Sequence, residues 1–313
     1  MRFIGVLNRD GGTFKTTDMD AFASRAVQMF ADTGHQFEPR VVSGKELIAE
    51  LERAANEAEV LVAGGGDGTI SAAAGIAFKR GVALAVLPAG TMNLFARSLQ
   101  MPLDLEAALR AIAAGDIRPV DIATANGKPF VHQFSVGIHA KLVKLREPLT
   151  YRSRVGKMIA SARALLGAIA QAPNFDADVN TSHGLERRRT AGISVSNNPV
   201  DGPVPVAERL DRGVLGIYII APLTPIVFSR LVPGAIRGQW KTLPEIIDRE
   251  AREVTLHFPR RKSDSVAVID GEIVTLEETV KLQIHPGALR VVMPPTTERE
   301  RGGPATAPVL TST

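Results

Sequence analysis

Apolar runs alternate with amphipathic segments over the first third of the chain. Period-2 and fully apolar runs predict strands at 2–7, 37–42, 60–63 and 82–87. Apolar positions at helical spacing predict helices at 18–31, 45–58 and 70–78. Such alternation is typical of a mostly parallel sheet with helices on both faces. Ligands of these sheets bind at the carboxyl ends of the strands, so we expect the polar loops that follow the strands to converge on one site.

After about residue 122 the pattern changes to strand alternation alone. Strands are predicted at 130–136, 176–180, 191–196, 214–220, 254–258 and 265–269. Asn126-Gly127 is a hairpin signal, and a helix over 155–170 interrupts the strands. We therefore expect an α/β nucleotide-binding domain over 1–122 and a β-rich domain over 123–293. The remaining 294–313, rich in Pro, Thr and Gly, is expected to be disordered.

One predicted strand, 60–63, runs directly into a glycine-rich turn that contains Asp67 and Thr69. Glycine lets a ligand approach the main chain, and the N-terminus of the following helix adds partial positive charge, which together favour a phosphate site. A carboxylate beside phosphates repels them unless a divalent cation lies between, or unless it accepts a hydrogen bond from a hydroxyl. Asp67 is therefore predicted to act in Mg²⁺-nucleotide binding.

The two better-known glycine loops do not fit this chain. The dinucleotide fingerprint needs a third glycine where Thr69 stands, and an acidic residue about 20 positions later, which is missing. A Walker loop ends in Gly-Lys-Ser/Thr, whereas Gly44-Lys45 is followed by Glu46.

Two further groups sit at predicted strand ends. Thr91 and Asn93 occupy a second strand-to-helix turn, after the strand 82–87. Asp270-Gly-Glu272 follows the strand 265–269 and places two carboxylates two positions apart. Such a pair can supply a general base and an orienting partner, but Asp-Gly-Glu is also a common β-turn.

Composition narrows the classes of protein. The hydrophobic content of 45% indicates a globular chain, and the absence of cysteine excludes disulfides and thiolate metal sites, which suits a reducing cytosol. Phe3–Leu7 is too short for a signal-peptide core, and 215–232 is interrupted by prolines and Arg230, so we expect a soluble protein. The six histidines show no ligand spacing and no Gly-x-Ser-x-Gly occurs, so metal-hydrolase and serine-hydrolase chemistry lack support.

The net charge is only +4, but basic residues form three groups. They are Arg152, Arg154 and Lys157; 187–189; and 260–262. Each group is either a solvated loop or a face for acidic lipid headgroups or nucleic acid. No nucleic-acid motif supports the last alternative, and we expect no nucleic-acid partner.

In order along the chain, these motifs resemble the diacylglycerol kinase catalytic family, which includes sphingosine, ceramide and bacterial lipid kinases. The motifs are Asn8 with Gly11-Gly12; Gly65-Gly66-Asp67-Gly68-Thr69; Gly90-Thr91 with Asn93 and Ala96-Arg97; and Asp270-Gly-Glu272. The resemblance covers about residues 1–293. It implies an α/β nucleotide domain and a C-terminal β-sandwich with the active site between them, and it allows the last strand to return to the first domain. It also implies ATP and Mg²⁺ as cofactors, and a lipid hydroxyl, such as that of diacylglycerol, as the acceptor at a membrane surface.

The resemblance also assigns roles to individual residues. The expected nucleotide-binding residues are Asn8, Ser43, Gly65, Gly66, Asp67, Gly68, Thr69, Thr91 and Asn93. Glu272 matches the general base, Asp270 its supporting partner, and Ser43 stands in for a threonine of relatives. Many bacterial relatives hold a structural Mg²⁺ with Asp-Gly-Leu, but this chain has Arg212 in place of the aspartate. Either Asp211 substitutes as ligand or the site is lost and the guanidinium replaces the cation; we favour loss.

Two other functions stay open. An NAD kinase shares the Gly-Gly-Asp-Gly loop but needs an Asn-Glu pair after it, and here Asn93 precedes Leu94. A non-catalytic nucleotide or lipid sensor could use the same scaffold. We expect a cytoplasmic protein that can associate peripherally with a membrane, where 215–240 either enters the interface or forms ordinary core. The sequence names neither the lipid nor the oligomeric state.

Overall fold

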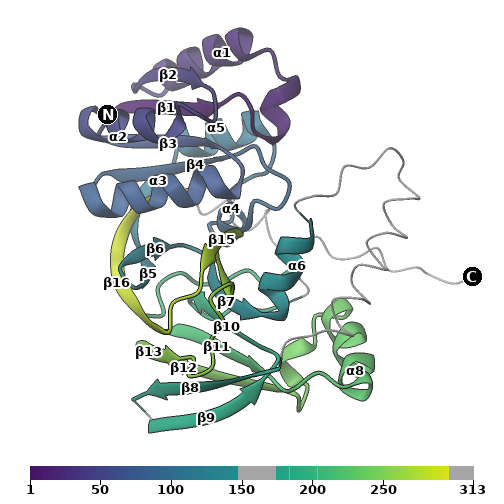
Figure 1. Cartoon of the computed structure of the whole chain (residues 1–313). Coiled ribbons are helices and arrows are strands. Elements are labelled where there is room, and N and C mark those ends of the chain that lie inside the picture. Colours follow the sequence, from purple (N-terminus) through teal and green to yellow (C-terminus); the bar gives the residue numbers. More distant parts are fainter. Residues whose placement is uncertain (147–173, 183, 203, 296–313) are drawn as a thin grey trace, which may run out of the picture. The chain divides into compact units, whose positions relative to one another are not determined.

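The computed structural model describes residues 1–146, 174–182, 184–202 and 204–295 (Figure 1). It divides into two compact units, Met1–Pro119 with the chain from Leu289 onward, and Val120–Ala288. Parallel strands alternate with helices in the first unit and antiparallel strands form the second, so the predicted fold class is confirmed. The predicted helix 155–170, the basic group at 152–157 and the predicted tail from residue 296 lie outside the described residues.

Four parallel strands in the order β2-β1-β3-β4 form the sheet of the first unit. They are β1 (Arg2–Asn8), β2 (Gln36–Val42), β3 (Val60–Gly65) and β4 (Ala83–Pro88). Every residue of β3 and β4 is buried, which explains their unbroken apolar sequence. The four loops at the carboxyl ends of these strands therefore share one edge of the sheet.

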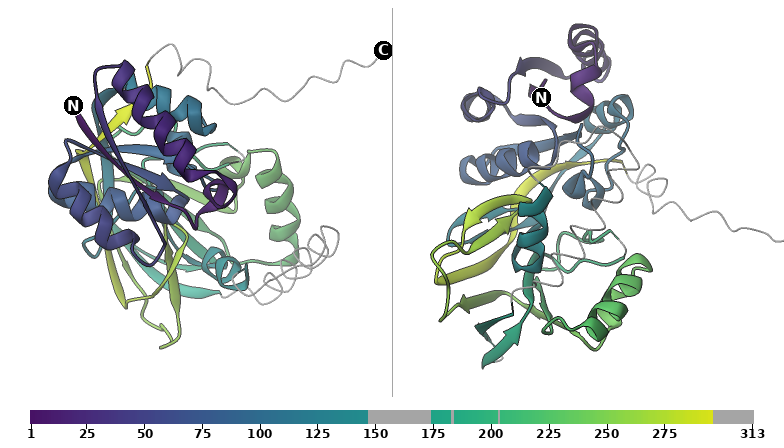
Figure 2. Two further views of the ribbon diagram at one scale, coloured as in Figure 1. Left: turned by 90° about the horizontal axis from the view of Figure 1, so that it is seen from above. Right: turned by 45° about the vertical axis from the view of Figure 1, so that its right-hand side comes forward.

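Helices cover this sheet in two packed pairs, α2 with α3 and α1 with α5 (Figure 2). The helices are α1 (Met19–Asp32), α2 (Leu47–Glu57), α3 (Asp67–Arg80), α4 (Leu94–Ser98) and α5 (Leu105–Ala113), with a short 3₁₀ turn η1 (Gly12–Thr16) after β1. Asp18 and Asp104 cap α1 and α5 by accepting backbone N–H bonds from Ala21 and Ala107. Gly81, in the left-handed conformation, ends α3. Helix α5 was not predicted.

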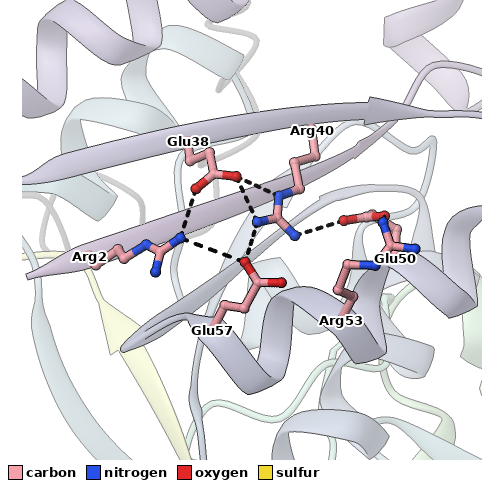
Figure 3. Close-up of polar contacts among 6 residues, drawn as sticks. All are labelled: Arg2, Glu38, Arg40, Glu50, Arg53 and Glu57. Carbon is pink, nitrogen blue, oxygen red and sulfur yellow. Dashed lines mark hydrogen bonds and ion pairs between the residues drawn. The ribbon is translucent and has the colours of Figure 1, made fainter.

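An ion-pair network ties β1, β2 and α2 together (Figure 3). The Arg40 guanidinium lies within 2.6–2.8 Å of carboxylate oxygens of Glu38, Glu50 and Glu57, and its side chain is only 17% exposed. Arg2 joins the network by contacting Glu38 at 3.0 Å. Hydrogen bonds from Arg2 and Arg40 lower the pKa of Glu38, so this carboxylate stays ionised at a lower pH than a free glutamate does.

Two antiparallel sheets form the second unit. One has the order β12-β11-β10-β7-β14-β15, and the other contains β16, β13, β8 and β9, with β5 and β6 beside β16. The strands are β5 (Asp116–Ala125), β6 (Lys128–Phe130), β7 (Gln133–Gly137), β8 (Phe175–Thr181), β9 (Gly184–Thr190), β10 (Gly192–Asn197), β11 (Leu215–Ile220), β12 (Ile246–Ala251), β13 (Glu253–His257), β14 (Val266–Ile269), β15 (Glu272–Thr275) and β16 (Thr279–Met293). Phe134, Ile193 and Ile217 of the first sheet share one buried core with Val179 and Leu256 of the second. The predicted β-sandwich architecture is thus present.

The last strand contributes to both units. Its first part pairs antiparallel with β13, from Thr279 opposite His257 to Gln283 opposite Glu253. Beyond Ala288 it belongs to the first unit, where Val291 pairs parallel with Leu84 of β4.

Several strands differ from their predicted form. The single strand expected over 130–136 is two strands, β6 and β7, and Asn126 and Gly127 form the predicted turn of the β5–β6 hairpin with φ values of 46° and 79°.

The predicted basic segment 187–189 lies in edge strand β9. Its neighbour Asp178 accepts from Arg187 at 2.6 Å. Charged side chains on an edge strand discourage pairing with another chain, which accounts for part of this basic character.

The apolar stretch 215–240 contains three elements: buried strand β11, helix α8 (Pro225–Ile236) and the 3₁₀ turn η2 (Trp240–Thr242). A further helix, α6 (Ile138–Arg146), follows β7. Trp240 donates its indole N–H to the carbonyl oxygen of Gly202 at 2.9 Å and packs edge-on against Tyr218. Trp240 is therefore anchored within its own unit. Among the described residues, none of the helices combines the length and apolar character needed to cross a membrane.

Candidate functional site

The glycine-rich turn of the first unit connects β3 to α3. Gly66 precedes the helix, and the first helical hydrogen bond runs from the Ile70 N–H to the Gly66 carbonyl at 3.1 Å. The N–H groups of Asp67, Gly68 and Thr69 therefore have no acceptor within the helix. They lie at the N-terminus of a 14-residue helix, which is the positive end of the helix dipole, and this arrangement is suited to binding an anion.

Three loops of this unit meet main chain to main chain. A Cβ atom on Gly90 would lie 2.6 Å from the Gly66 Cα, and one on Gly65 would lie 2.5 Å from the Thr69 hydroxyl. A Cβ atom on Gly12, which has a φ of 45°, would overlap the carbonyl oxygen of Ala89. Only glycine fits at these contacts, so the sequence requirement for glycine comes from the packing of the loops as well as from any ligand.

Asp67 links the first glycine turn to the second. Its Oδ2 accepts the Asn93 N–H at 3.0 Å and its Oδ1 accepts the Leu94 N–H at 2.7 Å, so it caps the N-terminus of α4. Asn93, with a φ of 50°, accepts from the Gly90 N–H and donates to the Gly90 carbonyl, both at 2.9 Å. Thr91 is left exposed at the tip of this turn.

Asn8 and Ser43 lie at the ends of β1 and β2. Asn8 donates its amide to the Thr69 hydroxyl at 3.3 Å and accepts the Asp10 N–H at 3.1 Å. The Ser43 hydroxyl donates to Glu46 at 2.6 Å, and this bond holds the pKa of Glu46 below its usual range. The Gly44 N–H donates to Asp10 at 2.8 Å. The structure thus brings together all the predicted nucleotide-binding residues of the first unit, in four loops joined by hydrogen bonds.

Asp270 and Glu272 belong to the second unit, in the β14–β15 hairpin. Asp270 has a φ of 48° and is 6% exposed. Its carboxylate accepts three backbone N–H bonds of 2.9 Å, from Val131, His132 and Gln133. Glu272, the first residue of β15, is exposed. Asp270 therefore fixes the turn that presents Glu272.

The region of the expected structural Mg²⁺ has a different organisation. Asp211 is 61% exposed and pairs with Arg209 at 3.0 Å, while the Arg212 guanidinium pairs with Glu250 at 2.9 Å on the surface. Asp121, which sequence reasoning missed, is 2% exposed and accepts the N–H groups of Gly213 at 2.7 Å and Gly287 at 2.9 Å. Within the described ranges no three His, Cys, Asp or Glu side chains are grouped as metal ligands. These residues do not fit a structural Mg²⁺, and Arg212 does not occupy the position of a buried cation.

The two basic segments of the second unit that the structure describes lie close together. Arg260 contacts Asp176 at 3.5 Å, and Asp176 is the strand partner of Arg189. Arg187 and Arg188 are paired with Asp178 and Glu186 at 2.6 and 2.8 Å. These ion pairs offset part of the local positive charge.

Comparisons with known proteins agree with this geometry. Residues 2–125 match the diacylglycerol kinase catalytic domain, which confirms the family resemblance. The chain is 27% identical over 304 residues to a probable lipid kinase YegS-like of Cronobacter sakazakii, covering 92% of this chain and 98% of that protein. It is 28% identical over 285 residues to a probable lipid kinase YegS of Salmonella gallinarum, covering 86% and 90%. A putative diacylglycerol kinase from Bacillus anthracis has the same fold, with a TM-score of 0.72 at 18% identity over 95% of this chain and 98% of that one.

Proposed function

We propose that the protein is an ATP-dependent lipid kinase that transfers the γ-phosphate to a lipid hydroxyl such as that of diacylglycerol. The observation that carries this proposal is the joined set of glycine loops beside the N-terminus of α3, within a matched kinase catalytic domain. Probable lipid kinases among the relatives support a lipid as the acceptor.

The loops of the first unit bind the triphosphate. Phosphoryl transfer depends mainly on positioning and on neutralising charge, which main-chain N–H groups at a helix N-terminus provide. Gly65 to Thr69 and Thr91 supply these donors, and Asn8 holds the Thr69 side chain in place. Ser43 is committed to Glu46, so it serves the nucleotide by shaping the loop after β2.

Mg²⁺ is the expected cofactor of the nucleotide. Each oxygen of the Asp67 carboxylate accepts one N–H bond and retains a second lone pair, so Asp67 is able to contact a metal-bound water. This suits an ion that usually keeps several waters and binds through phosphates with one or two carboxylates. When bound, Mg²⁺ neutralises charge on the phosphates.

Glu272 acts as the general base that accepts the proton of the lipid hydroxyl. An exposed carboxylate at the start of β15 is accessible to a substrate, and Asp270 holds its turn through three N–H bonds. A positioned base of this kind contributes about 10² to 10⁴-fold to the rate.

The lipid substrate requires contact with a membrane, so we infer a cytoplasmic enzyme that associates peripherally. The stretch around α8 is the part of the second unit expected to meet the interface. Sedimentation with vesicles of neutral and anionic lipid, with and without diacylglycerol, tests this association.

A kinase assay on a mixed lipid panel separates the alternatives. With γ-labelled ATP, label in a lipid product supports the proposal, and label in NADP⁺ after addition of NAD⁺ supports an NAD kinase. Nucleotide binding without transfer to any acceptor identifies a sensor and contradicts the proposal.

A further inference from the structure

Asp67 uses both carboxylate oxygens to hold a segment 26 and 27 positions away in sequence. Its oxygens accept the N–H groups of Asn93 at 3.0 Å and Leu94 at 2.7 Å. These are the first N–H groups of α4, a helix of five residues that has no other side-chain cap. Hydrogen bonds to an ionised carboxylate are about twice as strong as neutral ones, so this bond pair is a firm anchor for a short element.

The side chain of Asn93 connects the start of α4, which Asp67 holds, to the main chain of Gly90. Its side chain both accepts from and donates to the Gly90 main chain at 2.9 Å. Gly90 in turn lies against Gly66, so close that a Cβ atom on Gly90 would come 2.6 Å from the Gly66 Cα. The contacts therefore form a closed circuit in which Asp67 fixes the separation of the two glycine loops.

We propose that Asp67 is a positioning residue, which sets the spacing of the two phosphate-binding loops through Asn93 and contributes to nucleotide affinity independently of Mg²⁺. This inference rests on the proposed ATP-binding function. It differs from the role predicted from sequence, in which Asp67 acts through the divalent cation. If the main effect of the carboxylate is on the loops, its loss weakens nucleotide binding whether or not Mg²⁺ is present.

The test is calorimetric titration of Asp67→Asn with a non-hydrolysable ATP analogue, once in Mg²⁺ and once in EDTA. Asparagine retains one acceptor oxygen, but its amide group faces a backbone N–H donor, so one of the two bonds is lost. We expect the Kd to rise about tenfold or more in both conditions, as for loss of a charge-assisted hydrogen bond. A loss confined to Mg²⁺, or tighter binding in EDTA after relief of phosphate repulsion, would overturn the proposal.

A matched control is Asp104→Asn, which makes the same chemical change at the N-cap of α5. We expect it to leave the Kd of the analogue unchanged in both conditions. An equal loss of affinity in Asp104→Asn would mean that removing any helix-capping carboxylate disturbs the unit. The specific positioning role of Asp67 would then be contradicted.

Asn93→Gly gives a second, independent arm because glycine tolerates the φ of 50° while the side-chain clamp is removed. We expect Asn93→Gly to lose the same affinity for the ATP analogue with and without Mg²⁺. The double variant with Asp67→Asn should bind the analogue no more weakly than the weaker-binding of the two single variants. Unchanged affinity in Asn93→Gly, or additive losses, would contradict the proposal. Wild-type protein that binds no ATP analogue would contradict the proposed function itself, whereas normal wild-type binding with a purely Mg²⁺-dependent loss would contradict only the positioning role.

Discussion

Replacing Gly90 with alanine probes the contact between the two glycine loops. The new Cβ atom would lie 2.6 Å from the Gly66 Cα and 2.8 Å from the Asn93 Oδ1. Carbon atoms in contact prefer about 3.5–4.0 Å, so the two main chains must separate by roughly 1 Å. The Asn93 side chain can rotate away, but the Gly66 main chain cannot.

This displacement has two measurable consequences. Overpacking costs about 1–3 kcal/mol, which we expect to lower the melting temperature by several degrees. A misplacement of about 1 Å at a reacting centre can cost 10²-fold, so kcat/KM for ATP should fall by about that factor. Thermal unfolding and initial-rate kinetics over a range of ATP concentrations measure both.

Gly66→Ala is the control for the thermal measurement because its Cβ atom would lie 3.5 Å from the Gly90 Cα, an ordinary contact distance. We expect its melting temperature to match that of the wild type. A Gly90→Ala protein with wild-type melting temperature and wild-type kcat/KM would refute the close packing of these loops.

Three further variants test other parts of the structure. Arg40→Gln should lower the melting temperature at pH 7 by about 2–6 °C, since it leaves Glu38 and its neighbouring glutamates without their central cation. Because the pKa of Glu38 is lowered on folding, the stabilisation from its ionised form is present above its ordinary pKa and is lost as pH falls through the lowered value. The difference in melting temperature between the wild type and Arg40→Gln should therefore shrink in acid. A difference that stays constant from pH 7 to pH 3 would contradict this. Asp121→Asn should cost about 1.5–3 kcal/mol in urea unfolding, equally in Mg²⁺ and EDTA; a cost seen only in Mg²⁺ would indicate a metal site. Asp270→Asn should lower the melting temperature, whereas Glu272→Gln should leave it unchanged, and the reverse order would show that Glu272 supports the turn.

The fold of the first unit was largely predictable because its signals are local. Buried strands β3 and β4 are unbroken apolar runs, and α1 and α2 begin and end within about two residues of their predicted bounds. The glycines around Asp67 marked the strand-to-helix turn correctly. Helix α5 was missed, although Asp104 caps its N-terminus.

The second unit was harder to predict where a strand lacks an apolar face. Strand β9 lies at a sheet edge and carries Arg187 to Arg189, so it has no alternating apolar pattern. Strand β16 contains Pro286 and Gly287, residues that ordinarily mark a strand end.

Side-chain partners distant in sequence could not be predicted at all. Asp270 binds the N–H groups of a segment 137 to 139 positions away, and the partners of Asp67 lie 26 and 27 positions away. Both carboxylates were identified from their motifs as chemical groups, but their contacts exist only once separate loops have packed together. The hydrogen bonds from the Gly213 and Gly287 N–H groups to the Asp121 carboxylate have the same origin.

The most direct measurement of the central claim is transfer of label from γ-labelled ATP to diacylglycerol in mixed vesicles, with Glu272→Gln beside the wild type. We expect a labelled lipid product from the wild-type protein, and a kcat lower by about 10² to 10⁴-fold in the variant, because glutamine cannot accept the proton of the hydroxyl. The Kd of the variant for ATP should stay near that of the wild type. Label that enters no lipid of a wider panel while ATP is bound normally would contradict a lipid kinase, and a variant with wild-type kcat would remove Glu272 from the chemistry.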